Sequence, residues 1–148
     1  MSLKDRITED MKSAMKAGDK DRLKVVRLIL AAIKQVEVDT RKQLDDTAVL
    51  GVLDKMVKQR RDSVEQFTKG GRDDLAAIEE AEIAVVEGYL PAKMDDAELD
   101  ALIDEVIAST GAESIRDMCK VMGAIKSKAA GRADMGAVGS RVKERLGA

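Results

Sequence analysis

The sequence predicts an all-α protein, built from an N-terminal four-helix domain and a small C-terminal three-helix domain. Residues with high helix propensity dominate the 148-residue chain, aromatic residues make up 1% of it, and Pro91 is the single proline. Apolar residues recur at intervals of three and four, the period of a helix with one buried face. Because Pro91 disfavours helix at Leu90, we expect domains at residues 1–90 and 91–148.

Four helices are expected before Pro91, each bounded by a capping side chain or a glycine. We expect them to run from Ser2 to Gly18, from about Asp19 to near Arg41, from Asp46 or Thr47 to Gly70, and from Asp73 or Asp74 to Tyr89.

Three further helices are expected after Pro91. We expect them to run from Asp95 or Asp96 to Gly111, from Ser114 to Gly131, and onward from Asp134. The last of these carries Met135, Val138, Val142 and Leu146 at helical spacing, which predicts a buried stripe.

Two charged residues fall on apolar helix faces in the N-terminal domain. A helical wheel places Arg60 among apolar residues of the third helix and Glu82 among those of the fourth. A buried charge costs several kcal/mol unless it is paired, so we predict that Arg60 and Glu82 meet as a structural ion pair. Arg61 or Arg72 could replace Arg60 as the partner, and a ligand-binding carboxylate is the alternative role for Glu82.

The charge of the chain changes sign within the C-terminal domain. The formal net charge is −2, so any polyanion must bind to a local surface. Residues 92–113 are strongly acidic, whereas basic residues dominate after residue 113. This asymmetry predicts either a surface that binds an anion or a solvated helix face.

Gly123 lies beside Arg116 and Lys120 on the polar side of the sixth expected helix. A glycine inside a helix costs about 0.5–1 kcal/mol relative to alanine, which indicates that another group approaches the backbone there. That group could be an RNA phosphate or merely a neighbouring helix.

The composition argues against several other classes of site. The chain has no histidine, and Cys119 is its single cysteine, so an intramolecular disulfide and a Cys/His zinc site are excluded. Cys119 is expected to act as a small apolar filler. We expect no catalytic residues, metal or cofactor, no membrane span, and a cytoplasmic location.

Several motifs resemble the YqeY family, in the order and spacing that the family shows. They are Lys58-Gln59-Arg60-Arg61-Asp62-Ser63, Gly71-Arg72-Asp73-Asp74-Leu75, Tyr89-Leu90-Pro91, Lys120-Val121-Met122-Gly123 and Gly131-Arg132-Ala133-Asp134. The resemblance covers essentially the whole chain. It implies a C-terminal domain similar to the tail of GatB, the B subunit of the tRNA-dependent amidotransferase, where the tail is understood to contact tRNA.

The resemblance and the charge pattern together define a candidate RNA surface. Its residues are Arg116, Lys120, Gly123, Lys126, Lys128, Arg132, Arg141 and Lys143. The tail motif also includes Gly131 and Asp134, which are explained first by helix capping. This chain departs from the family in having Cys119 where a glycine is usual and Ser127 where a proline is common.

Three functions are compatible with these features. The leading hypothesis is a tRNA-binding or tRNA-enzyme accessory module without a catalytic site, whose partner is tRNA or a tRNA-processing or aminoacylation enzyme rather than DNA. The second is a protein-interaction module. The third, implied by the family alone, is a carbon-nitrogen ligase with glutamine as amido donor in a tRNA amidotransferase system. The sequence leaves the oligomeric state open.

Overall fold

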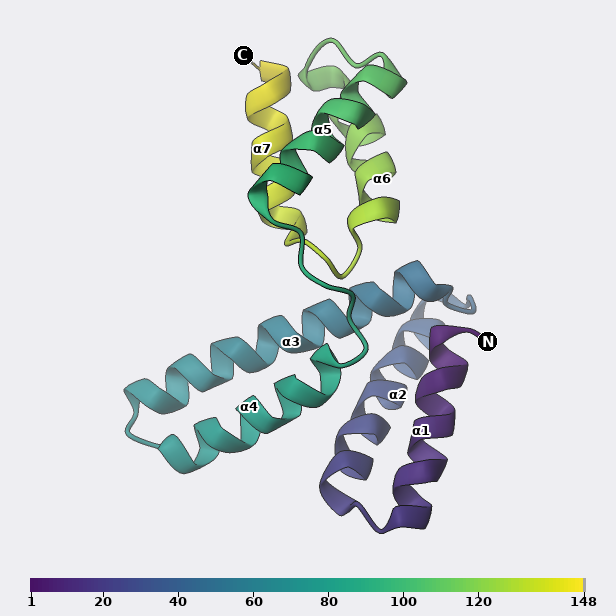
Figure 1. The fold of residues 1–148 in the computed structure, drawn as a ribbon, viewed down its shortest axis with the longest axis vertical. Helices are drawn as coiled ribbons and strands as arrows, with labels where there is room; N and C mark the ends of the chain where they lie inside the picture. Colours follow the sequence, from purple (N-terminus) through teal and green to yellow (C-terminus); the bar gives the residue numbers. More distant parts are fainter. Residues whose placement is uncertain (148) are drawn as a thin grey trace. The chain divides into compact units, whose positions relative to one another are not determined.

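The computed structural model describes residues 1–147, and all of its regular elements are helices within that range. The chain divides into two compact units, Met1–Leu90 and the part that begins at Pro91 (Figure 1). The all-α fold class predicted from helix propensity and apolar spacing is confirmed.

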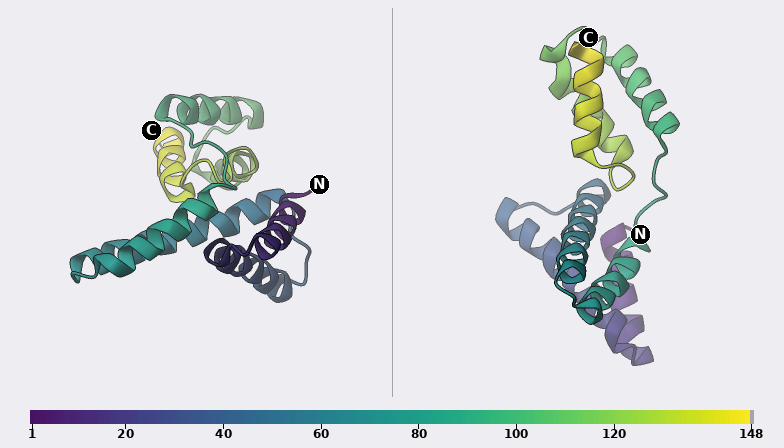
Figure 2. Two further views of the ribbon diagram at one scale, coloured as in Figure 1. Left: turned by 60° about the horizontal axis from the view of Figure 1, so that its bottom comes forward. Right: turned by 90° about the vertical axis from the view of Figure 1, so that its left-hand side faces the viewer.

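The N-terminal unit contains four helices arranged as two hairpins. They are α1 (Leu3–Ala17), α2 (Lys20–Thr40), α3 (Asp46–Lys69) and α4 (Asp73–Glu87). The α3 and α4 helices lie side by side in both further views (Figure 2). Helix α2 packs against both α1 and α4, so it occupies the centre of the unit.

Three helices of this unit, α1, α2 and α3, begin at capping side chains, whereas Arg72 at the start of α4 makes no such hydrogen bond. Ser2 accepts from Asp5 N–H at 3.1 Å within a full capping box, and Asp19 accepts from Arg22 N–H at 3.2 Å. The cap of α3 is Asp45, which accepts from Ala48 N–H at 2.9 Å, so our expectation of Asp46 or Thr47 was wrong by one or two residues. Each free acceptor satisfies a backbone donor that the helix itself leaves unpaired.

Helix α4 ends earlier than expected, at Glu87 rather than at Tyr89. Tyr89 and Leu90 donate to the carbonyls of Val86 and Glu87 at 3.1 and 3.0 Å, which is the tighter i to i−3 pattern. This turn buries Tyr89, whose exposed fraction is 6%, against the core of the unit.

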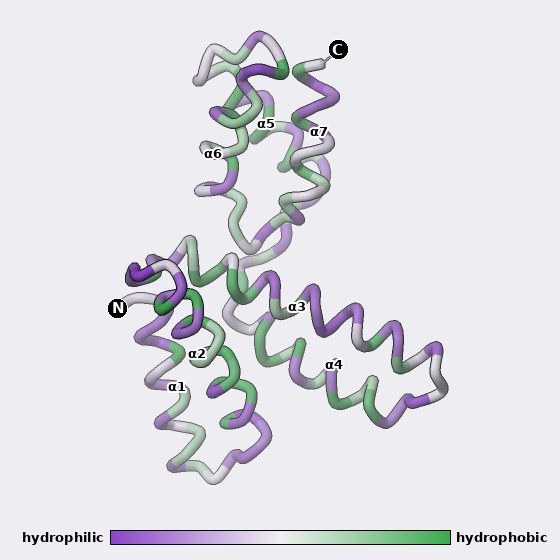
Figure 3. The backbone as a smooth tube through the Cα atoms, turned by 180° about the vertical axis from the view of Figure 1, so that it is seen from behind, coloured by the Kyte–Doolittle hydropathy of each residue, from purple (hydrophilic) through white to green (hydrophobic). Residues whose placement is uncertain are grey.

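The core of the N-terminal unit is aliphatic. The fully buried side chains come from all four helices and include Ile7, Val26, Ile29, Ile33, Leu53, Val57 and Val86. Hydrophobic and hydrophilic residues alternate along these helices (Figure 3), as expected for helices that bury one face.

The C-terminal unit contains α5 (Asp96–Thr110), a short 3₁₀ helix η1 (Ile115–Asp117), α6 (Met118–Ala129) and α7 (Met135–Gly147). Its core includes Ile103, Val106, Val121, Ile125, Val138 and Val142. We expected one continuous helix from Ser114, but the first turn is 3₁₀, with Ser114 accepting from Arg116 N–H at 3.4 Å. Asp134 accepts from Gly136 N–H at 3.1 Å at the start of α7.

Candidate nucleic-acid interface

The candidate RNA residues of the C-terminal unit lie on three helices and one loop. Arg116 belongs to η1, and Lys120, Gly123, Lys126 and Lys128 belong to α6. Arg132 lies in the loop between α6 and α7, and Arg141 and Lys143 lie on α7. Contacts of α6 with both α5 and α7 hold these elements together, so their charges share one small unit.

Three of these basic side chains form ion pairs with acidic residues. Arg141 of α7 donates to Asp100 at 3.0 Å and to Asp96 at 2.6 Å. Lys128 of α6 pairs with Glu105 at 3.3 Å. The acidic and basic stretches that are separate in the sequence therefore face each other across the unit.

Arg132 is the third of these paired residues, and its contacts hold the segment that leads into α5. Its Nε donates to the carbonyl of Ala92 at 2.8 Å, and its Nη2 pairs with Glu98 at 3.1 Å. Met94 N–H also donates to the carbonyl of Arg132 at 2.9 Å. These contacts indicate a structural role for Arg132.

Acidic residues of α5 thus neutralise several cations of the candidate RNA surface. Arg145, which was not among the candidates, pairs with Asp100 at 3.7 Å and also with Asp104. The hydrogen bond to Asp96 is the main cause that raises the pKa of Arg141, and Asp100 adds to it. The eight candidate residues therefore do not form one continuous cationic surface.

The remaining basic candidates are exposed and make no ion pair among residues 1–147. They are Arg116, Lys120, Lys126 and Lys143. At 100° per residue, Lys128 points toward α5, whereas Lys120 and Lys126 border the opposite arc of α6. We call these four exposed residues, Arg116, Lys120, Lys126 and Lys143, the open cationic face.

Gly123 lies in the middle of the open cationic face and is exposed. A Cβ atom added there would meet no described atom within 4 Å. Gly139 of α7 differs, because its added Cβ would lie 3.8 Å from Met122 and 3.9 Å from Met118. Gly139 therefore faces α6 at ordinary contact distance, whereas no neighbouring helix approaches Gly123.

Asp117 is an acidic residue close enough to Lys120 to feel its charge. It accepts from Glu113 N–H at 3.0 Å, and this backbone hydrogen bond is the main cause that lowers the pKa of its carboxyl. Ser114 contributes next, and the charge of Lys120 lowers the pKa further. Asp117 therefore remains ionised while its lone pairs serve the backbone.

In the N-terminal unit, Arg60 and Glu82 are in contact between α3 and α4. Arg60 Nε donates to Glu82 Oε2 at 3.0 Å, and Lys24 lies 3.8 Å from the other oxygen. The alternative partners have different positions, because Arg61 pairs with Glu87, and Arg72 pairs with Asp74 at 3.1 Å. The contact explains how Glu82 can be 9% exposed.

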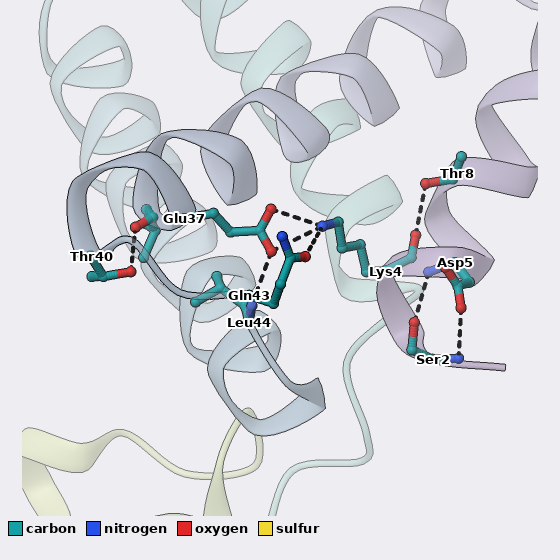
Figure 4. A network of polar contacts seen from close by, with 9 residues as sticks. Ser2, Lys4, Asp5, Thr8, Glu37, Thr40, Gln43 and Leu44 are labelled. Carbon is teal, nitrogen blue, oxygen red and sulfur yellow. Dashed lines mark hydrogen bonds and ion pairs between the residues drawn. The ribbon is translucent and has the colours of Figure 1, made fainter.

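A second buried carboxylate, Glu37, was not predicted. Its oxygens accept from Lys4 Nζ at 2.8 and 2.9 Å and from Leu44 N–H at 3.0 Å (Figure 4). Lys4 is the first cause, and Leu44 the second, that lowers the pKa of Glu37. Glu37 follows Ile33 by four residues on the buried face of α2, so the same wheel that found Glu82 could have found it.

Tyr89 forms a further polar contact in the N-terminal unit. Its hydroxyl donates to Asp10 at 2.5 Å, and Arg22 approaches the hydroxyl oxygen at 3.5 Å. Burial, followed by the hydrogen bond to Asp10, raises the pKa of Tyr89 to about 12. The guanidinium of Arg6 lies over the ring at 5.6 Å. These contacts tie the end of α4 to α1 and α2.

The part of the chain that the structure describes offers neither a metal site nor a membrane span. No group of three or more Cys, His, Asp or Glu side chains there could hold a metal ion. None of the described helices combines the length and apolar character needed to cross a bilayer.

Comparison with known families identifies the chain. A family described as Yqey-like protein matches residues 4–146. The chain belongs to the YqeY-like family. The resemblance to this family that the sequence motifs indicated is thereby confirmed.

Curated relatives of this YqeY-like chain carry the name "Altered inheritance of mitochondria protein 41, mitochondrial". The relative in Eremothecium gossypii is 40% identical over 87 residues, which cover 58% of this chain and 48% of the relative. The relative in Pyrenophora tritici-repentis is 30% identical over 147 residues, covering 97% of this chain and 80% of the relative. The chain spans about half the length of the Eremothecium gossypii relative.

These names contradict the cytoplasmic location that we expected, because the relatives are named as mitochondrial proteins. The expectation was wrong for a physical reason. A low cysteine content and short apolar runs separate reducing from oxidising compartments and membrane from non-membrane proteins, but they do not separate mitochondria from the cytosol.

The positions at which this chain departs from the family motif lie on α6. Cys119 is exposed, so the expectation that it is a small apolar filler of the core was wrong. The hydroxyl of Ser127 donates to the carbonyl of Ala124 at 2.9 Å, and the residue is exposed. Neither residue projects over Gly123 closely enough to meet an added Cβ within 4 Å.

Proposed function

We propose that this YqeY-like protein is an RNA-binding accessory module, in which the open cationic face of the C-terminal unit contacts the phosphate backbone of tRNA. The observation that carries the proposal is the division of charge within the unit. Arg141, Lys128 and Arg132 are held by acidic partners, whereas Arg116, Lys120, Lys126 and Lys143 remain exposed without one among residues 1–147.

The open cationic face suits a phosphate backbone better than a base-reading site. Lysine and arginine side chains neutralise phosphates and release counterions, and the energy of this process does not depend on base sequence. Tyr89 and Phe67, the chain's aromatic residues, belong to the N-terminal unit, so α6 and α7 offer no ring on which a base could stack. Recognition would therefore rest on charge and shape.

Gly123 supports the same proposal from a different direction. Its missing side chain leaves the backbone of α6 exposed between Lys120 and Lys126, and no internal contact requires this. A phosphate or ribose could approach the helix more closely there than at any residue with a side chain.

The test measures tRNA binding by fluorescence anisotropy over a range of salt concentrations. The Lys120→Glu, Lys126→Glu double variant is expected to bind at least about tenfold more weakly, and the slope of log K against log salt should fall by about 2. The matched control is Lys55→Glu, Lys58→Glu on α3, which makes the same change in net charge.

The control variant should retain wild-type affinity. Equal affinities for wild type and the α6 variant would overturn the proposal, and so would equal losses in both variants, because equal losses would indicate a nonspecific effect of net charge. Duplex DNA of the same length serves as competitor, and it should displace tRNA poorly.

A further inference from the structure

The outer face of α4 in the N-terminal unit is apolar although it is exposed. Ala77, Ile78, Ala81 and Ala84 all lie on this face, and Ile78 is 53% exposed. The outer face of a surface helix normally carries charged residues. On α4 the charged residue Glu80 instead lies at the border of this face. Exposed apolar residues that adjoin one another indicate a binding surface.

This face continues into a cleft between α4 and α2. The cleft has a volume of about 220 Å³, and its apolar lining consists of Val25, Ile78, Ala81 and Val85. On its α2 side the surface extends to a second hollow, with Leu23, Leu28 and Ala31 as its apolar residues. Lys24 lines both hollows, and Leu28 is 40% exposed, so the apolar surface spans both helices.

Basic residues border this groove along α2. Lys20, Lys24 and Arg27 line the second hollow, and no acidic residue lines it. In the cleft, Glu82 is held by Arg60 at 3.0 Å, with Lys24 at 3.8 Å. Asp21 and Arg22 also line the cleft, and Arg22 pairs with Asp10 at 3.9 Å. Lys24 shares Glu82 with Arg60, and Lys20 and Arg27 form no ion pair among residues 1–147, so the α2 border carries a net positive charge.

We propose that this groove binds an amphipathic α-helix of a partner protein, whose apolar stripe packs on Leu28, Ile78 and Ala81 and whose acidic flank faces Lys20, Lys24 and Arg27. An apolar floor with a charged border on one side is the usual complement of such a helix, and the charges set its orientation.

The shape of the groove favours this occupant over a polyanion or a lipid surface. A phosphate backbone would leave the apolar floor unburied, because it offers only charge and sugar. A bilayer is too flat to enter a cleft between two helices, whereas single apolar side chains of a helix can do so. The proposal does not depend on RNA binding by the C-terminal unit.

The first test uses photo-cross-linking of the full-length chain in its native cells. A benzophenone amino acid is placed at Ile78, and in a control at Val38, which is 59% exposed on α2 but lines neither hollow. The cross-linked segment is then sequenced. The expected product from position 78, absent from position 38, is a segment whose helical wheel shows an apolar stripe with Asp or Glu along one flank.

Other products overturn the proposal. These are a segment without that pattern, a second copy of this chain, another part of the same chain, RNA, lipid, or no more product at position 78 than at position 38. Circular dichroism of the labelled chains checks that both are folded, which is expected because both positions are on the surface.

The second test addresses the charges. The Lys20→Glu, Arg27→Glu variant keeps the apolar floor and should reduce cross-linking from position 78 about tenfold. The Lys55→Glu, Lys58→Glu variant on α3, with the same change in net charge, should leave the yield unchanged. An unchanged cross-linking yield in the α2 variant would show that the bound segment is not an acidic helix.

Discussion

Arg60 donates from its Nε to Glu82 at 3.0 Å and thereby joins α3 to α4 between two largely buried side chains. The net contribution of such a pair to the free energy of unfolding is small, because the cost of removing both charges from water offsets much of their attraction. We predict that the contact helps to fix the register of the α3–α4 hairpin.

Replacing one member of this pair should therefore be worse than replacing both. Arg60→Leu or Glu82→Leu alone is expected to lower the free energy of unfolding by about 2 kcal/mol, since each leaves a buried charge without its partner. The double variant should lose less than the sum of the single losses. Urea denaturation of the four proteins completes the cycle, and additive losses would show that the pair is not coupled.

Glu37 predicts a dependence of stability on acidic pH. Because Lys4 and Leu44 lower its pKa in the folded state, its contribution is present above the unfolded pKa of 4.5 and is lost as the pH falls through the folded value. Glu37→Gln should therefore be less stable than wild type at neutral pH, and the difference should shrink at pH values below 4.5. Thermal melts across this range provide the measurement, and a constant difference would contradict the assignment.

Tyr89 can be titrated without interference, because it is the only tyrosine and the chain has no tryptophan. Its absorbance should report a phenol pKa near 12, and Asp10→Asn should lower that pKa toward 10.0. A raised folded pKa contributes stability that is present below pH 10.0 and is lost as the pH rises through about 12. Circular dichroism at each pH separates titration of the folded protein from unfolding.

Gly123→Ala separates folding from RNA binding. A Cβ there meets nothing within 4 Å, so the variant should be more stable by about 0.5–1 kcal/mol through helix propensity alone. Gly123→Leu should fold equally well but should weaken tRNA binding, because its side chain covers the exposed backbone. Unchanged tRNA affinity in the leucine variant would show that RNA does not approach α6 at this point.

Gly139→Ala provides the comparison within the same unit. Its added Cβ would lie in ordinary van der Waals contact with Met118 and Met122, at 3.9 and 3.8 Å, so Gly139→Ala is expected to gain at least as much stability as Gly123→Ala. Denaturant unfolding of both variants measures the difference.

Much of the fold was predictable because its signals are local. The capping side chains of Ser2, Asp19 and Asp95 act within three residues, and the apolar period determines which face of each helix is buried. The same period located Arg60 and Glu82 on buried faces. Glu37 was missed although the wheel placed it equally well, because the position of Lys4 beside it depends on how α1 packs against α2.

The sequence by itself determined the helical class, the element order and the separation of acidic from basic residues after Pro91, since propensity, spacing and charge can all be read along the chain. Only the tertiary structure decided which cations remain available. Packing brings α5 against α6 and α7, so that Asp96, Asp100 and Glu105 neutralise Arg141 and Lys128, while Lys120 and Lys126 are exposed on the other arc. Coulomb attraction acts over ångströms in space, and the order of residues along the chain does not specify those distances.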